Sequence, residues 1–177
     1  IIATGLYDRE FLCQYSNAGQ LINVNEASDE FGFFVRTEVP EEEACYEPQD
    51  KLWWDRKTNR PVVTHMAGAD PFLLGEFTLS DGTSVKPAFQ LLKERVADYT
   101  PAWAASVTGI PEETIRRLAH EMGVTARDQR IELPIAWTDS WGNEHESVTG
   151  NPVAFHAMRG LAAHSNGFQT IRALGIL

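Results

Sequence analysis

The residues best suited to chemistry lie between Arg159 and Gly167, near the carboxyl-terminal end of the sequence. Glycines let a backbone approach a ligand closely, and the free amides at a helix start attract a pyrophosphate or another oxygen-rich group. We therefore predict a ligand-binding loop that consists of Arg159, Gly160, His164, Ser165, Asn166 and Gly167. The alternative is a plain turn between a strand and a helix, with His164 capping it.

Two elements would hold this loop in place. The apolar run at 153–158 predicts a strand before the loop, and the pattern from Phe168 predicts the start of a helix after it. His156 falls within the apolar run, so we interpret it as a core side chain and not as a ligand.

A pair of helices is the best-defined pattern in the middle of the chain. Thr100 followed by Pro101 is typical of a helix start, and Gly109 is a natural stop for that short helix. Pro111 opens the next helix, which we expect to end at Gly123. Four apolar residues at helical spacing would form its buried stripe: Ile115, Leu118, Ala119 and Met122.

The first half of the chain has weaker patterns. Residues 1–15 read as a helix, and 77–85 read as a β-hairpin with a turn at Asp81-Gly82. The stretch at about 24–85, which includes this hairpin, resembles an insertion laid over a larger body, because so long a stretch with little periodicity is unusual in a compact domain. Trp53 and Trp54 would pack this insertion onto its host.

Composition excludes several functions. The 177 residues include 15 basic and 25 acidic side chains, a net charge of −10, which argues against binding to nucleic acid phosphates. Six carboxylates without a Lys or Arg lie at 38–50, and we interpret them as a solvated loop. The two cysteines, Cys13 and Cys45, are too far apart for a metal motif. Glu144-His145-Glu146 is also an unconvincing metal or acid–base cluster, since adjacent loop residues seldom converge.

Two other classes of function remain open. Residues 102–122 imitate a helix-turn-helix DNA-binding module, but Glu112 and Glu113 at the start of the would-be recognition helix would repel phosphate. A non-catalytic scaffold or interaction module, with the acidic loop docking a basic partner, is the second alternative.

Three stretches resemble the molybdopterin oxidoreductases of the dimethyl sulfoxide reductase superfamily. Residues 5–18 are similar to a segment where a helix ends in a tyrosine–threonine–asparagine-type turn, here with Ser16 in place of threonine. Residues 99–119 are similar to the family's helix pair, and 159–174 to its glycine-containing loop before a helix. The resemblance indicates an interior fragment of the large catalytic subunit, most like polysulfide or thiosulfate reductases and sulfite dehydrogenases.

The resemblance implies a cofactor. Family members hold molybdenum or tungsten between two molybdopterin guanine dinucleotides, and the protein positions this group. The six loop residues from Arg159 to Gly167 would then be part of the cradle, with donors suited to a pterin or guanine edge. The metal ligand and the [4Fe-4S] cluster would lie outside this segment, so no catalytic and no metal-ligating residue is assigned.

We therefore expect an α/β fold made of parts of two domains of a larger subunit. Residues 1–128 would be helix-rich, with the acidic insertion at about 24–85, and 129–177 would form a strand, loop and helix facing the cofactor. The implied partners are a ferredoxin-like iron–sulfur subunit, often with a membrane anchor, in a bacterial, membrane-associated complex. The segment by itself is expected to be inactive, to expose apolar surface and to self-associate.

Overall fold

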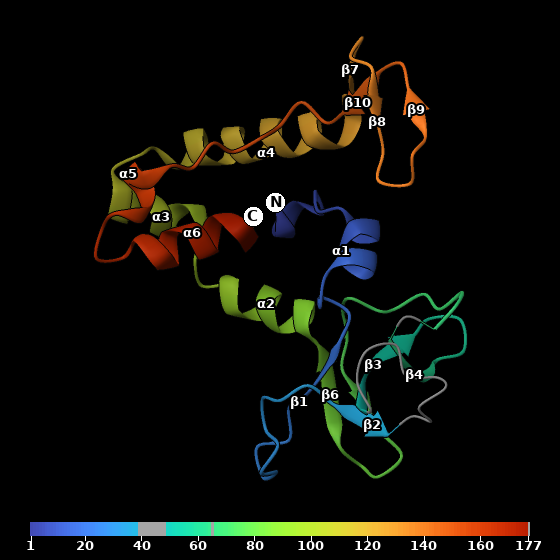
Figure 1. Ribbon diagram of the computed structural model, residues 1–177. Coiled ribbons are helices and arrows are strands. Elements are labelled where there is room, and N and C mark those ends of the chain that lie inside the picture. Colours follow the sequence, from blue (N-terminus) through green and yellow to red (C-terminus); the bar gives the residue numbers. More distant parts are fainter. Residues whose placement is uncertain (39–48, 65, 177) are drawn as a thin grey trace. The chain divides into compact units, whose positions relative to one another are not determined.

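The computed structural model describes residues 1–38, 49–64 and 66–176, which form two compact units. Unit 1 is Ile1–Arg117 and unit 2 is Leu118–Leu177. Figure 1 shows their helices and short strands, and the expected mixed α/β class is confirmed. Among the described helices, none combines the length and the apolar character needed to cross a bilayer.

Unit 1 holds most of the elements. Its helical segments are η1 (Ile2–Thr4), α1 (Arg9–Tyr15), α2 (Ala88–Val96) and α3 (Pro101–Thr108). Its strands are β1 (Leu21–Asn23), β2 (Arg36–Glu38), β3 (Gln49–Asp55), β4 (Arg60–Val63), β5 (Phe77–Thr78) and β6 (Ser84–Pro87). Helix α4 (Glu112–Asp128) begins in unit 1 and continues into unit 2, so the boundary between the units falls within this helix.

The single helix expected at 1–15 is interrupted. Gly5 takes a left-handed conformation with φ 67°, which ends η1. Asp8 is extended, and its side chain accepts a hydrogen bond from the Phe11 amide at 2.9 Å, so α1 starts only after it.

The strands of unit 1 form two antiparallel sheets within the described residues, in the orders β1-β6-β5 and β2-β3-β4. The predicted hairpin is confirmed as β5 and β6, with Gly82 at φ 87° in the turn. Trp53 in β3 bridges to Gln20, which precedes β1, so the insertion is joined to the first sheet by backbone pairing.

The core of unit 1 has two clusters. The first contains Cys13, Ala18, Leu73 and Phe89, with the Tyr7 ring 4.8 Å from that of Phe89. It ties α1 to the start of α2.

The second cluster contains Leu21, Trp54 and Val85. Leu21 and Val85 are fully buried, which contributes roughly 1.5–3 kcal/mol for each side chain. Trp54 stacks on Phe77 with ring centroids 4.6 Å apart. The interpretation of Trp53 and Trp54 as packing residues is therefore supported, because both side chains are buried.

The helix pair starts as expected and ends differently. The Thr100 hydroxyl accepts a hydrogen bond from the Trp103 amide, and Gly109 ends α3 with φ 73°. The expected end of α4 at Gly123 is wrong, because the helix continues to Asp128 and buries this glycine. The predicted stripe is not fully buried either, since Leu118 is half-exposed.

Unit 2 continues from α4 into a ribbon. Its strands are β7 (Ile131–Leu133), β8 (Trp137–Thr138), β9 (Glu144–His145) and β10 (Val148–Gly150). β7 pairs with β10, and β8 pairs with β9 inside them, so residues 131–150 form one interrupted antiparallel ribbon. Pro134 follows β7 and has no amide hydrogen to donate, which explains the interruption.

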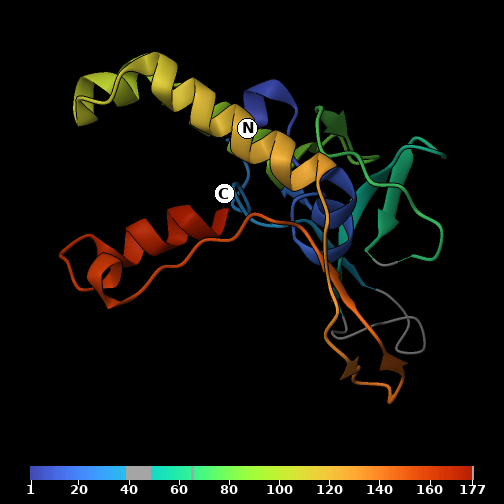
Figure 2. The same ribbon diagram turned by 90° about the horizontal axis from the view of Figure 1, so that it is seen from above.

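The last part of unit 2 is α5 (Arg159–Ala162) followed by α6 (Gly167–Ile176). The strand expected at 153–158 is wrong: this segment runs extended into α5 without pairing to any described strand (Figure 2). An apolar run by itself does not form a strand, because its backbone groups need a partner. His156 is exposed, so its interpretation as a core residue is also wrong.

Candidate functional site

The six predicted binding residues lie at the corner between α5 and α6. Arg159 and Gly160 belong to α5, so the loop expected there is wrong for the first four residues, which are helical. The Ala163 amide closes this turn by donating to the Arg159 carbonyl oxygen at 2.8 Å. Only 163–166 connect the two helices. The corner is therefore tighter than a strand-to-helix loop would be.

Gly167 shapes the corner by its lack of a side chain. A Cβ atom built on Gly167 would lie 2.0 Å from the Ala162 carbonyl oxygen. Gly167 is also buried, and its amide donates to the His164 carbonyl oxygen at 3.0 Å. The close approach of the two helices thus requires glycine at this position.

The polar side chains of the corner are open to solvent. His164, Ser165 and Asn166 are exposed, and none of their side chains hydrogen-bonds to another residue that the structure describes. α6 has no acidic side chain in its first turn, so nothing from the helix itself neutralises its positive end. These donors suit an anionic or carbonyl-rich ligand.

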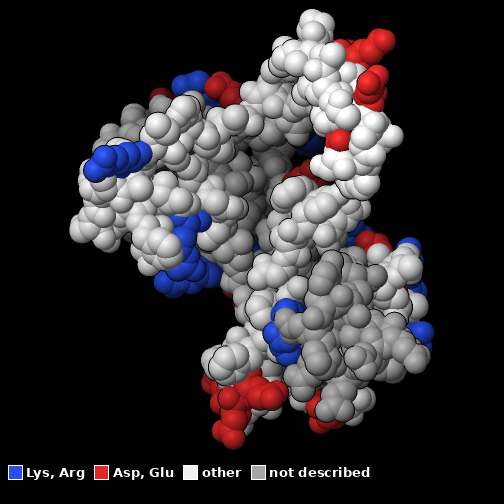
Figure 3. Space-filling model, viewed as in Figure 1, with Lys and Arg blue, Asp and Glu red and all other residues white. Residues whose placement is uncertain are grey.

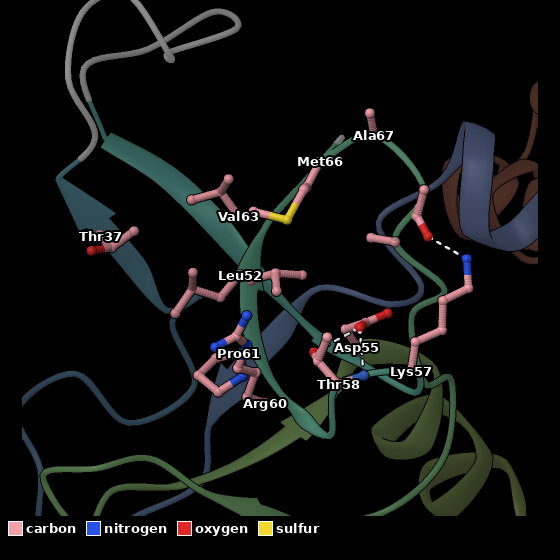
Figure 4. A pocket seen from close by; sticks show the side chains of 13 residues that line it. Thr37, Leu52, Asp55, Lys57, Thr58, Arg60, Pro61, Val63, Met66 and Ala67 are labelled. Atoms are coloured by element: carbon pink, nitrogen blue, oxygen red, sulfur yellow. Dashed lines mark hydrogen bonds between the residues drawn. The ribbon is translucent and has the colours of Figure 1, made fainter.

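Unit 1 has a separate hollow of about 540 Å³ beside the β3–β4 hairpin (Figure 4). Leu52, Val63 and Met66 contribute apolar wall, and the ammonium group of Lys57 donates to the Gly68 carbonyl oxygen. Lys57 thereby ties the turn of the hairpin to the segment that contains Gly68.

Asp55 illustrates this structural role. Its carboxylate accepts the Asp70 amide at 2.8 Å and both the amide and the hydroxyl of Thr58, at 2.8 and 2.7 Å. The bond from the Asp70 amide is the largest of the effects that lower the pKa of Asp55 to about 2. The group is therefore ionised and fully used, so it is a poor general acid or base. Sequence reasoning missed Asp55, although an aspartate three residues before a threonine is a recognisable turn signal.

A smaller hollow of about 280 Å³ lies beside Cys13. Burial raises the pKa of the Cys13 thiol, which keeps it protonated. Arg9 closes one side by pairing with Asp70 at 2.5 Å and donating to the Pro71 carbonyl oxygen at 2.8 Å. We interpret this cluster as structural.

Three other sequence expectations concern possible ligands. His145 pairs with Asp139 at 3.2 Å and not with its neighbours Glu144 and Glu146, so the triplet is no converging cluster. No group of three metal-ligating side chains gathers among the described residues. The acidic loop lies largely outside the described residues, at 39–48, together with Cys45.

The structure contains the two helices that the helix-turn-helix hypothesis requires, α3 and α4, but the first turn of α4 is acidic. The Glu112 carboxylate pairs with Arg116 at 2.6 Å, and Glu113 adds a second carboxylate to the first turn of α4. A recognition helix would need a basic first turn to meet phosphates.

Comparison with known proteins decides between the remaining classes. No family model matches the chain. The A subunit of the sulfite dehydrogenase of Allochromatium vinosum is 66% identical over 177 residues, all of this chain and 18% of that protein. The alpha subunit of the perchlorate reductase of Dechloromonas aromatica is 47% identical over 74% of this chain and 17% of its own length. The molybdopterin-containing subunit of an arsenate respiratory reductase from a Shewanella species is 32% identical over 38% of this chain and 7% of its length.

The chain belongs to the molybdopterin oxidoreductases of the dimethyl sulfoxide reductase superfamily. The alignment with the first relative covers the whole chain, including residues 24–85, where the resemblance in sequence motifs is weakest. The chain spans less than a fifth of the length of the first two of these relatives. Membership in this family disfavours both the DNA-binding and the pure scaffold hypotheses.

Proposed function

We propose that this chain is part of the catalytic subunit of a molybdenum enzyme that performs redox chemistry on a sulfur compound, with sulfite as the first substrate to test. The observation that carries the proposal is the 66% identity to a sulfite dehydrogenase subunit over all 177 residues. The perchlorate reductase relative is less similar and aligns with 74% of the chain, so a chlorine oxyanion is the weaker candidate.

The corner between α5 and α6 is the part of the chain that we propose as a cofactor cradle. When bound, a bis-molybdopterin guanine dinucleotide centre would supply the exchange of an oxygen or sulfur atom with the substrate. The amides in the first turn of α6 would attract an anionic part of this group. Arg159 would add a guanidinium for a phosphate, and His164, Ser165 and Asn166 would donate to a polar ring edge. Their exposed donors and the uncompensated helix end fit such a ligand.

Electrons would leave the catalytic subunit through iron–sulfur centres. We propose a [4Fe-4S] cluster outside this chain and a ferredoxin-like partner subunit, with a membrane anchor that ties a bacterial complex to its membrane. The first relative is one of the subunits of a sulfite dehydrogenase, which supports an assembly of several different chains. We propose that the chain by itself is inactive, because the residues that ligate the metal would lie outside it.

The first test is metal analysis of the native polypeptide that contains this sequence, purified without oxygen. We expect about one molybdenum or tungsten per polypeptide, together with sulfite oxidation that exceeds perchlorate reduction. A metal-free polypeptide would overturn the enzyme proposal, and the reverse order of activities would overturn the substrate.

The cradle has its own test. His164→Ala and Asn166→Ala, made in the same full-length subunit, should lower molybdenum content and turnover. His120→Ala is the matched control, because His120 is exposed on α4 and away from the corner in sequence. If the metal content of all three variants equals that of the wild type, the corner does not hold the cofactor.

A further inference from the structure

Asn166 directly precedes Gly167 at the corner between α5 and α6, and this pair of residues has a chemistry of its own. The backbone nitrogen of a residue can attack the side-chain carbonyl carbon of an asparagine just before it. Glycine hinders this attack least, because it has no Cβ atom. The Asn166 side chain hydrogen-bonds to no other residue that the structure describes, so its amide is not held away from its neighbour. The pair is therefore a candidate site of deamidation.

The reaction needs water and neither an oxidant nor a metal. The Gly167 nitrogen forms a bond to Cγ of Asn166, the bond from Cγ to Nδ2 breaks, and ammonia leaves with the proton of the Gly167 amide. Water then opens the resulting succinimide at one of its two carbonyl carbons. The product is aspartate, or isoaspartate in which the backbone runs through the former side chain.

In the closed corner the attacking nitrogen is engaged. The Gly167 amide is buried and donates to the His164 carbonyl oxygen at 3.0 Å. The Asn166 carbonyl oxygen accepts the amide and the hydroxyl of Thr170, at 3.0 and 3.1 Å, which fixes the peptide between the two reacting residues. Attack requires loss of the Gly167 amide proton and rotation of this peptide, and both break these bonds. All of them lie within 164–170, so they do not depend on what the rest of a longer polypeptide covers.

The corner has little to keep it closed. α5 consists of only four residues, Arg159–Ala162, a length at which a helix has almost no stability of its own. Segments of this kind open locally without unfolding of the whole protein. The rate of deamidation is then the rate in the open chain multiplied by the fraction of time that the corner is open.

The product changes the charge at the start of α6. From Ser147 to Leu177 the sequence has two arginines and no Asp or Glu. The four carboxylates that follow Asp128 all lie in the ribbon 131–150, at the upper right of Figure 3. A carboxylate at position 166 would lie next to the positive end of α6, which favours the helix. It would also repel an anionic ligand from the free amides of the first turn.

We propose that Asn166 is a deamidation site which a filled corner suppresses and an empty corner exposes, so that a subunit left without cofactor loses its capacity to bind one. The proposal rests on the cradle function given above, because the cofactor is the group that would hold the corner closed. A group that binds only the closed form lowers the open fraction as its occupancy rises.

The experiment follows Asn166 in the full-length subunit, prepared with its cofactor and from cells that cannot make the cofactor. Both forms are incubated at mildly alkaline pH. The tryptic peptide 160–172, which Arg159 and Arg172 delimit, is then analysed by mass spectrometry for aspartate and isoaspartate at position 166. Conversion should be at least about 10-fold slower in the loaded form. Asn143 precedes a glutamate and is the reference asparagine, which should keep its amide in both forms.

Two pairs of substitutions separate the gate from its consequence. Thr170→Val removes the hydroxyl bond to the Asn166 carbonyl oxygen and should speed conversion in the empty form, whereas Thr170→Ser should keep the wild-type rate. Asn166→Gln closes the ring poorly because its side chain is longer, so its uptake of cofactor should be the same before and after incubation. The wild type should lose uptake during the same incubation, and Asn166→Asp should show reduced uptake from the start.

Two results would overturn the proposal. If Asn166 keeps its amide in the empty subunit but loses it in the urea-unfolded chain, the corner stays closed without a cofactor. If conversion is equally fast in both forms while the loaded form contains its metal, the cofactor does not hold the corner, and the enzyme proposal stands. A polypeptide that never binds metal fails earlier, at metal analysis, so the two failures are distinguishable.

Discussion

Replacement of Gly167 by alanine tests the geometry of the α5–α6 corner most directly. The new Cβ would lie 2.0 Å from the Ala162 carbonyl oxygen, and real Cβ atoms essentially never approach within 3.0 Å, so the helices must separate by at least 1.0 Å. Forced overpacking of this kind costs about 1–3 kcal/mol. The opening free energy of the corner should fall by this amount.

Amide hydrogen exchange in the full-length protein is the suitable assay, because it reports opening segment by segment. A fall of about 1–3 kcal/mol corresponds to roughly 5- to 150-fold faster exchange across 159–170. Gly160→Ala is the control, since a Cβ there meets nothing within 4 Å. It lies within α5, so alanine should stabilise the helix by about 0.5–1 kcal/mol. Exchange in Gly167→Ala that is as slow as in the control would refute the close approach.

Three further predictions concern unit 1. Trp54→Ala should lower the free energy of unfolding of this unit by about 3–5 kcal/mol, measured by urea denaturation, whereas Trp54→Phe should lose less because an aromatic stack with Phe77 remains. The pKa of the Asp55 carboxyl is lowered to about 2, so its stabilising effect is full above pH 3.8 and disappears as the pH falls through 2. Asp55→Asn should therefore remove this part of the loss of stability in acid, measured by urea denaturation between pH 2 and 5. Thr100→Ala should destabilise α3 by about 1 kcal/mol, and Thr100→Ser should restore the cap, as followed by exchange of the Trp103 amide.

The features that sequence reasoning predicts correctly are those encoded by neighbouring residues. The cap at Thr100, the left-handed end at Gly109 and the turn at Gly82 each depend on a contact or a conformation within a few positions. Local chemistry of this kind can be read from sequence because the interacting groups are adjacent in the chain.

The errors fall where the outcome depends on distant partners or on competing local costs. Strand β3 escapes prediction because its pairing partners, β2 and β4, define it, and its own residues show little alternation. Gly123 costs helix stability, but the residues around it keep α4 intact to Asp128. The apolar run at 153–158 resembles a strand in composition, yet it pairs with no described strand and instead leads into α5.

The candidate site is only partly predictable for the same reason. The donors His164, Ser165 and Asn166 stand out as residue types, but the close contact between Gly167 and Ala162 exists only because α5 forms. The tip of the ribbon is recognisable in sequence only as polar and turn-rich, because exposure of Trp141 cannot be inferred from its identity.

The uneven distribution of the core has a consequence for how the chain is made. All buried apolar side chains that the structure describes lie between Cys13 and Phe89. Within this stretch a ribosome delivers these residues before unit 2, so the buried side chains of unit 1 can meet while unit 2 is still being added. The ribbon and the α5–α6 corner emerge afterwards, with exposed apolar side chains such as Trp141 and Phe168. During synthesis they are therefore the segments on which a chaperone would act, until assembly covers them.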